Sequence, residues 1–161
     1  MLHEMKEDDF IVSKTDLKGR ITYVNKIFME MAEYTEEELL GKPHSIVRHP
    51  DMPKAVFKLL WDMVQNKEEI FAFVINKTKN NNSYWVYANV TPSFDERGNL
   101  IGYYSVRRRP NPKALEIIKP LYKQMLEAEK SGGVAAGTKV LTDLLHEKGV
   151  SYNELIIDIQ R

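Results

Sequence analysis

The chain has 161 residues, which suits one domain or one domain with a tail, and its 43% hydrophobic and 29% charged residues are typical of a soluble globular protein. Its formal net charge of zero excludes the basic excess of a general nucleic-acid binder. Cysteine is absent, which excludes disulfides, thiolate chemistry and flavin photochemistry that needs a cysteine adduct. No apolar run reaches the ~18 residues of a membrane span and residues 1–9 lack an apolar signal core, so we expect a cytoplasmic protein without direct membrane insertion.

Strand and helix signals alternate through the first half of the chain. Two runs with strand composition flank the turn residues 16–19, which predicts a hairpin. Asn25 is a typical helix N-cap, and Thr35 and Glu38 have the spacing of a capping box. The predicted elements are strands at 10–15 and 20–24, short helices after Asn25 and Thr35, and an amphipathic helix over 53–65.

The second half predicts a three-stranded meander followed by helices. Turns rich in asparagine and glycine separate the three strands, which we expect at 71–76, 84–92 and 100–108. The predicted tail has a helix from Pro112, a break at 131–133, a second helix over 138–146 and a third that starts after Ser151.

This order of elements indicates an α+β fold. We expect a five-stranded antiparallel sheet with short helices on one face and a C-terminal helical tail. The sheet and its helices would form one domain over residues 8–109, and residues 110–161 would form the helical extension.

The segment from Pro43 to Pro53 contains two histidines, an arginine, an aspartate and three prolines. Proline fixes its own φ and restricts the preceding residue, so this segment is held in one irregular shape. Polar side chains on a stiff turn suit ligand recognition. The same residues are also compatible with a loop and a helix start, with Asp51 near the helix N-terminus and Pro53 in the first turn. Local evidence leaves both interpretations open.

Three segments carry a resemblance to a known family, at 15–25, 41–53 and 84–92. The first resembles the opening hairpin of PAS sensor domains and the third their next-to-last strand. The second is very similar to a loop of Aer-type aerotaxis receptors. The resemblance covers roughly residues 8 to 130. The chain contains no transmembrane or signalling module, and it therefore most resembles the PAS-only cytoplasmic component of a bipartite energy-taxis system.

This resemblance implies a cofactor, a partner and a set of contact residues. Aer-type proteins hold FAD non-covalently and signal its redox state, and the PAS-only members work with a separate transmembrane chemoreceptor or transducer. The family's flavin contacts fall on Arg48, His49, Asp51, Trp61 and Asn76. One position departs from the pattern: the aromatic residue expected just before the third strand is Ile70. The nearby Phe71 and Phe73 need not face the same way.

Strand alternation assigns side chains to the two faces of the predicted sheet. Ala72 and Val74 share a face with Asn76, whose carboxamide can both donate to and accept from a flavin edge. On the next strand, Val86 and Ala88 suit the pocket side. The intervening aromatic residues Trp85 and Tyr87 would then face outward, where the tail, a second copy or a partner would cover them. Arg107 shares its strand face with Tyr103 and Ser105 and would point inward.

The sequence favours a non-enzymatic sensor, since it contains no Walker loop, GxGxxG or HExxH motif and no convincing metal site. Two alternative functions stay open at this point, and a third, an enzyme, has the least support in the sequence. His49 or His44 would serve as axial ligand in a haem-binding gas sensor. A PAS domain whose pocket is filled by side chains would be an interaction module without a ligand. A homodimer is also compatible with the sequence.

Overall fold

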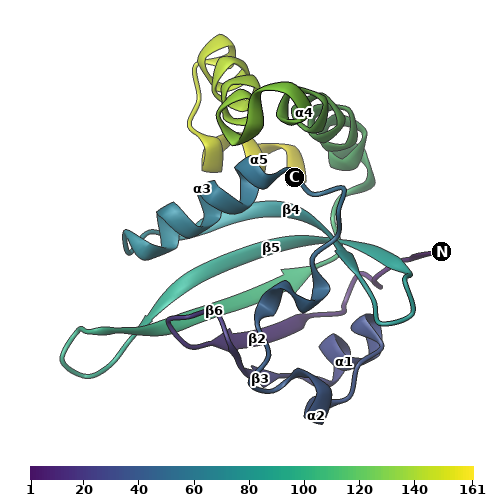
Figure 1. Cartoon of the computed structure of the whole chain (residues 1–161), viewed down its shortest axis with the longest axis vertical. Coiled ribbons are helices and arrows are strands. Elements are labelled where there is room, and N and C mark those ends of the chain that lie inside the picture. The colour runs from purple at the N-terminus through teal and green to yellow at the C-terminus, as the bar shows by residue number, and fades with distance from the viewer.

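A curled six-stranded sheet forms the centre of the computed structural model, which describes residues 1–161 (Figure 1). β5 pairs with β4 through its first half and with β6 through its second half, and β6 continues the sheet to β2 and β3. The strands are β1 (Leu2–His3), β2 (Ile11–Thr15), β3 (Ile21–Val24), β4 (Ile70–Lys77), β5 (Ser83–Phe94) and β6 (Leu100–Arg108).

The five expected antiparallel strands are confirmed, and one strand was missed. β1 pairs in parallel with β5 through Leu2 and His3. Two residues are too short to display the alternation by which a strand is recognised in a sequence. The sheet therefore has six strands, and the sixth ties the N-terminus of the chain to β5.

Helices begin and end where the capping residues predict. Asn25 caps α1 by accepting a hydrogen bond from the Phe28 N–H, Thr35 and Glu38 form the expected capping box of α2, and Ser151 caps α5. None of the helices combines the length and the apolar character needed to cross a membrane. The helices are α1 (Lys26–Ala32), α2 (Glu36–Leu39), the 3-10 turn η1 (His44–Val47), α3 (Lys54–Gln65), α4 (Pro112–Lys148) and α5 (Tyr152–Gln160).

The tail breaks within the expected segment. α4 leaves helical geometry at Gly133, whose φ of 68° is easily reached only by glycine, and its second part ends at Gly149, which is also left-handed. Figure 1 shows α4 and α5 gathered beside α3 at one end of the molecule, with α1 and α2 at the other end beside β3.

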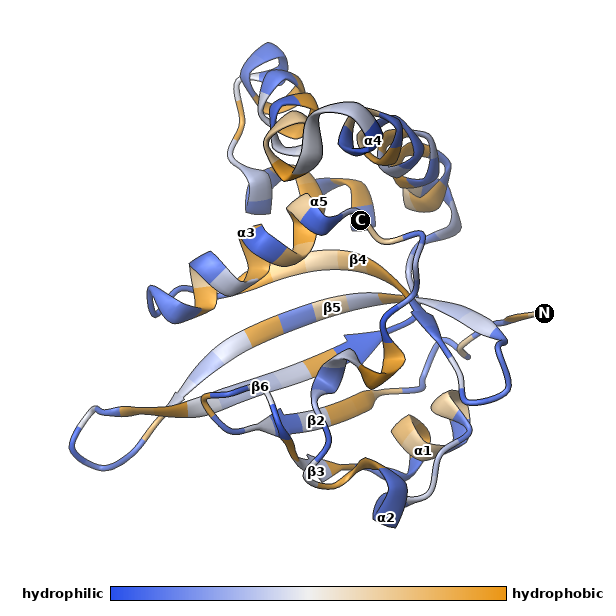
Figure 2. Ribbon diagram, in the orientation of Figure 1, coloured by the Kyte–Doolittle hydropathy of each residue, from blue (hydrophilic) through white to orange (hydrophobic).

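The tail covers the outer face of the sheet, as the strand alternation predicts for Trp85. The Trp85 ring packs on that of Tyr122 in α4, with centroids 6.0 Å apart, and the Tyr122 hydroxyl donates to the Phe73 carbonyl. Asn153 in α5 accepts a hydrogen bond from the Phe71 N–H at 3.1 Å. Figure 2 shows apolar residues along β4 and the helices that lie beside it. Burying such aromatic side chains stabilises the docked tail by about 1.5–3 kcal/mol each.

A carboxylate from the tail caps α3. Pro53 occupies the N-cap position and makes no side-chain cap, while Glu129 of α4 accepts hydrogen bonds from the Lys54 and Ala55 N–H groups at 2.9 and 3.0 Å. Gly137, beyond the break in α4, leaves room for this contact, because a Cβ there would lie 2.3 Å from Glu129 Oε2. The start of α3 is therefore tied directly to the tail.

We expect Glu129→Ala to lower the free energy of unfolding by about 1–2 kcal/mol, because two amide donors at the start of α3 lose a charged acceptor. Urea denaturation measures this change. The matched control is Glu127→Ala on the same helix, where the exposed carboxylate pairs only with Lys130. This surface substitution should change the free energy of unfolding by no more than about 0.5 kcal/mol. Equal effects of the two substitutions would contradict the capping role.

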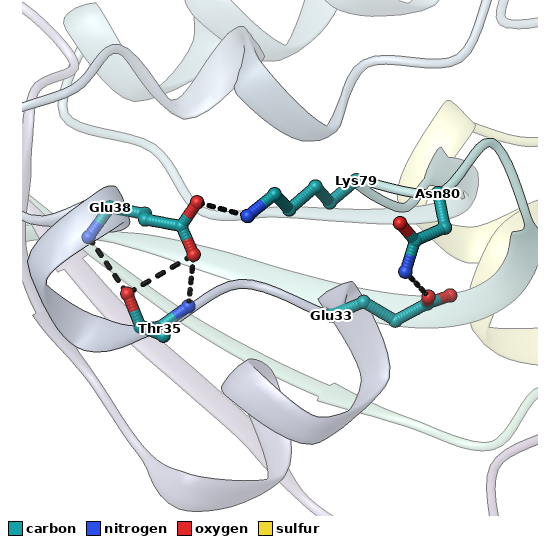
Figure 3. A network of polar contacts seen from close by, with 5 residues as sticks. All are labelled: Glu33, Thr35, Glu38, Lys79 and Asn80. Atoms are coloured by element: carbon teal, nitrogen blue, oxygen red, sulfur yellow. Dashed lines mark hydrogen bonds and ion pairs between the residues drawn. The ribbon is translucent and has the colours of Figure 1, made fainter.

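A polar network joins the turn after β4 to the region of α1 and α2 (Figure 3). Glu38 pairs with Lys79, and Glu33 accepts hydrogen bonds from Asn80 and, at 2.7 Å, from Asn82. Hydrogen bonds from Asn82, then from Thr78 and Asn80, lower the pKa of the Glu33 carboxyl to about 2. This network fixes the end of β4, where the candidate asparagine lies.

Candidate ligand-binding site

A cavity of about 280 Å³ lies between the inner face of the sheet and α3. Its sheet side carries small apolar residues, including Val74 and Ala88, and its helix side carries Phe57 and Trp61. The exposed Lys18 also lines it, so the cavity opens to solvent. Its volume is near the lower end of the ~300–1,000 Å³ typical of small-molecule sites.

The predicted assignment of strand faces is confirmed. Ala72, Ala88 and Arg107 are consecutive cross-strand partners on β4, β5 and β6, so two small side chains lie beside the arginine on the inner face. Val74, Ala88 and Arg107 all line the cavity. The small residues leave room that larger side chains would have filled.

Asn76 is 2% exposed at the end of β4 and lines the cavity. Its backbone forms an isolated bridge to Arg48, and its side-chain Nδ2 has no hydrogen-bond partner. Its cross-strand neighbour Tyr84 also has a buried hydroxyl without a partner, and burial raises the pKa of that hydroxyl to about 12. Buried polar atoms are rarely left unpaired. The Asn76 carboxamide lies close enough to the Tyr84 hydroxyl to lower that pKa against the effect of burial, so Asn76 Nδ2 can donate either to this hydroxyl or to a ligand oxygen.

Arg48 and Trp61 also line the cavity, on the side that opens to solvent. The exposed Arg48 guanidinium lies over the Phe57 ring, 4.1 Å from its centroid. Trp61 packs edge-on against Tyr103 with centroids 5.4 Å apart. The structure thus brings together three of the five residues that the family resemblance singled out.

His49 and Asp51 lie outside the cavity lining. The His49 Nδ1 accepts a hydrogen bond from the Asp51 N–H at 2.9 Å, and the Asp51 side chain is 73% exposed. Their contact with a ligand stays a prediction. The expected placement of Pro53 in the first turn of α3 was wrong, because Pro53 precedes the helix at the N-cap.

Four polar side chains on the cavity wall form a cluster that sequence reasoning captured only in part. Arg107 donates from Nε to Ser105 Oγ and from NH2 to His44 Nε2, each at 3.1 Å, and the Ser13 hydroxyl lies 3.1 Å from the same His44 nitrogen. Strand alternation had predicted that the Arg107 side chain points inward, on the same face as Ser105. Nothing local in the sequence indicated that His44, 63 residues away from Arg107, would meet it.

His44 is a neutral acceptor in this cluster. Burial, with the adjacent Arg107 cation as the second cause, lowers the pKa of its imidazole to about 3. Arg107 can only donate, so the Nε2 that faces it carries the ring's lone pair and the ring proton belongs on Nδ1. Haem ligation through Nε2 would take up that lone pair and break the contact with Arg107, which weighs against His44 as an axial ligand.

The aromatic residues of the cavity differ from those that flank Ile70. Ile70 itself is fully buried, and Phe71 and Phe73 pack against Tyr87 on the outer face of the sheet, so neither phenylalanine replaces the missing aromatic residue. The aromatic residues that line the cavity are Phe57, Trp61 and Tyr103. Phe57 was visible in the sequence only as one apolar position of α3.

Residues 8–109 match the model of the PAS fold, so the chain belongs to the PAS family. This confirms the expected α+β PAS fold. The chain is 38% identical to the aerotaxis receptor of Escherichia coli (strain K12) over 136 residues, or 84% of this chain and 27% of the receptor. The match supports the expected resemblance to Aer-type PAS domains. The chain is also 25% identical to phototropin-1A of Oryza sativa subsp. japonica, over 65% of this chain and 11% of that protein.

Solved structures share the fold at low sequence identity. A light-oxygen-voltage domain characterised with a flavin analogue has a TM-score of 0.59 at 20% identity, over 71% of this chain and 86% of that one. A blue-light activated histidine kinase of Erythrobacter litoralis has a TM-score of 0.60 at 15% identity, over 80% of this chain and 42% of that one. These likenesses show the PAS architecture alone.

Proposed function

We propose that this chain is a cytoplasmic, non-enzymatic PAS sensor that binds FAD and signals redox state to a transmembrane chemotaxis transducer. The observation that carries the proposal is the cavity wall, where Asn76 Nδ2 and Arg107 NH1 are buried donors without partners. The similarity to an aerotaxis receptor and the fold shared with a light-oxygen-voltage domain studied with a flavin analogue support it.

The residues present fit a flavin. Its ring is planar and presents carbonyl oxygens and ring nitrogens along one edge, which suit donors such as Asn76 and Arg107. Trp61 and Phe57 offer aromatic surface to the ring. The diphosphate of FAD carries negative charge, and the exposed cations Lys18 and Arg48 lie where the cavity opens.

A bound flavin supplies reversible redox chemistry, and the protein supplies orientation and hydrogen bonds. Asn76 would respond to the redox state of the ring by changing whether its side-chain amide donates a hydrogen bond to the ring or accepts one from it. Its backbone bridge to Arg48 leads into the loop before α3, and Glu129 ties the start of α3 to α4. We propose that the sensor unit at 8–109 shifts the population of tail conformations at 110–161 by this route, and that the transducer reads the tail.

Absorption spectroscopy of the protein purified and saturated with FAD tests the proposal. We expect flavin bands and, after denaturation, release of FAD near one equivalent per chain, identified by mass spectrometry. A Soret band would instead indicate the haem alternative. A protein that stays colourless after addition of FAD would indicate a module without a ligand. Either result would overturn the flavin assignment.

Arg48→Ala should weaken FAD binding with little effect on folding, because the guanidinium lies at the cavity opening rather than in the core. Loss of one charge-assisted contact of about 1.5–3 kcal/mol corresponds to roughly a ten- to hundredfold lower affinity. Fluorescence titration with FAD measures it. Arg97→Ala, in the exposed β5–β6 turn, should leave the affinity unchanged. If Arg48→Ala lowers Tm and leaves the affinity unchanged, Arg48 is a structural residue of the loop.

A further inference from the structure

Arg107 is a buried cation without a counter-charge. Its side chain lies on the inner face of β6, and the residue is 7% exposed. The ion pairs of the molecule involve other residues, and no carboxylate reaches this guanidinium. Placing an ion in the interior costs several kcal/mol unless charge or hydrogen bonds compensate. The position of Arg107 therefore requires an explanation.

The neighbours orient Arg107 without neutralising it. Ser105 and His44 accept from Nε and NH2, and both are neutral. Ser13 Oγ and the guanidinium contact the same nitrogen of His44, Nε2, which fixes the orientation of the imidazole beside Arg107. The remaining nitrogen, NH1, is buried and has no partner. The result is a fixed cation with one free donor on the wall of the cavity.

A structural role would predict different surroundings. An arginine that stabilises a protein interior is paired with a carboxylate or has its donors satisfied. Here the cation has Ala88 as its direct cross-strand partner and the Phe28 ring 5.9 Å away, and neither residue supplies a negative charge. The second unpaired donor on this wall, Asn76 Nδ2, belongs to β4, which β5 separates from the β6 strand of Arg107. Arg107 NH1 and Asn76 Nδ2 are buried donors on one cavity wall, and only Asn76 has a hydroxyl, that of Tyr84, beside it, so the wall offers Arg107 NH1 to an electronegative ligand edge.

We propose that Arg107 is the counter-charge of the bound ring, donating from NH1 to its acceptor edge and favouring its reduced, negatively charged form. The inference rests on the proposed flavin function. A neutral oxidised flavin that takes up two electrons from a reductant and one proton from solvent would become a reduced flavin with one negative charge. A fixed cation stabilises that charge more than it stabilises the neutral ring, and so raises the reduction potential.

The test compares Arg107→Gln and Arg107→Met with Arg108→Gln. Arg108 is the matched control, because it is the next residue of β6, is exposed, and lies over Tyr87 on the opposite face. Each variant is examined without ligand by thermal denaturation. With FAD, each is examined by fluorescence titration and by a dithionite titration against a reference dye.

For Arg107→Met we expect unchanged or higher Tm without ligand, since an uncompensated buried charge is removed, and at least tenfold weaker FAD binding. For Arg107→Gln we expect a lower reduction potential. If the reduced form loses tenfold more affinity than the oxidised form, the potential falls by about 30 mV. Arg108→Gln should change neither quantity.

Two results would overturn the inference: a lower Tm without ligand for Arg107→Met together with unchanged FAD affinity, or the same potential in Arg107→Gln as in the wild type. Failure of the flavin proposal can be told apart from failure of the inference on Arg107. If the wild type binds no FAD, both the flavin proposal and the redox role of Arg107 are wrong. The stability measurement still reports whether Arg107 is an uncompensated charge.

Discussion

Ala88→Leu should abolish FAD binding while the protein keeps or gains stability. Ala88 is 1% exposed on the sheet side of the cavity, between its cross-strand partners Ala72 and Arg107. A leucine there would occupy the space that we assign to the ring, and we expect the affinity to fall on the order of a hundredfold or more. Filling an apolar cavity commonly adds about 0.5–2 kcal/mol to the free energy of unfolding. FAD titration and urea denaturation together measure both changes.

A lower FAD affinity together with unchanged or higher stability would indicate that the leucine blocks the site, whereas damage to the fold would lower both quantities. Ala88→Ser is the matched control, because it adds a single atom at the same position and should leave most of the affinity intact. A leucine variant that binds FAD like the wild type would show that the ligand lies elsewhere. A leucine variant that loses both stability and binding would show that the cavity cannot accept the side chain, and Val74→Leu would then probe the same wall.

Acid should destabilise the protein through His44 before its carboxylates titrate. The pKa of His44 is lowered to about 3 in the folded protein, whereas an unfolded histidine titrates near 6.5. Below about pH 6.5, His44 is therefore protonated in the unfolded state but stays neutral in the folded state. The free energy of unfolding then decreases as the pH falls, by up to about 1.4 kcal/mol per pH unit. Above that pH the contribution of His44 to stability is fully present.

His44→Gln should remove most of this slope between pH 6.5 and 4.5. Burial also lowers the pKa of His49, which leaves a smaller slope of the same sign. Glu33 acts in a lower window, because its carboxyl titrates near 2 in the folded protein and its stabilisation is lost only as the pH falls below about 4.5. Urea denaturation at several pH values measures the slope, with the exposed His146→Gln as control. A full slope in the His44 variant would contradict the assignment.

Much of the fold followed from the sequence because its signals are local. Caps at Asn25, Thr35 and Ser151 each bind the N–H three residues further along the chain, and Gly149 ends a helix through its own backbone conformation. Strand alternation is equally local, since each side chain faces opposite to its neighbours. For that reason the inward position of Ala88 could be predicted without knowing its partners.

Contacts between distant segments were decided only by the tertiary structure. Glu129 caps α3 from 74 residues away, and His44 meets Arg107 across 63 residues. The polar loop at 43–53 shows the same limit, because its sequence does not determine which side chains turn toward the sheet: Arg48 lines the cavity, whereas Asp51 faces solvent. The family resemblance named residues of the site, but the uncompensated charge of Arg107 is a property of the assembled cavity. A buried cation is recognised only when all the elements around it are in place and none supplies a carboxylate.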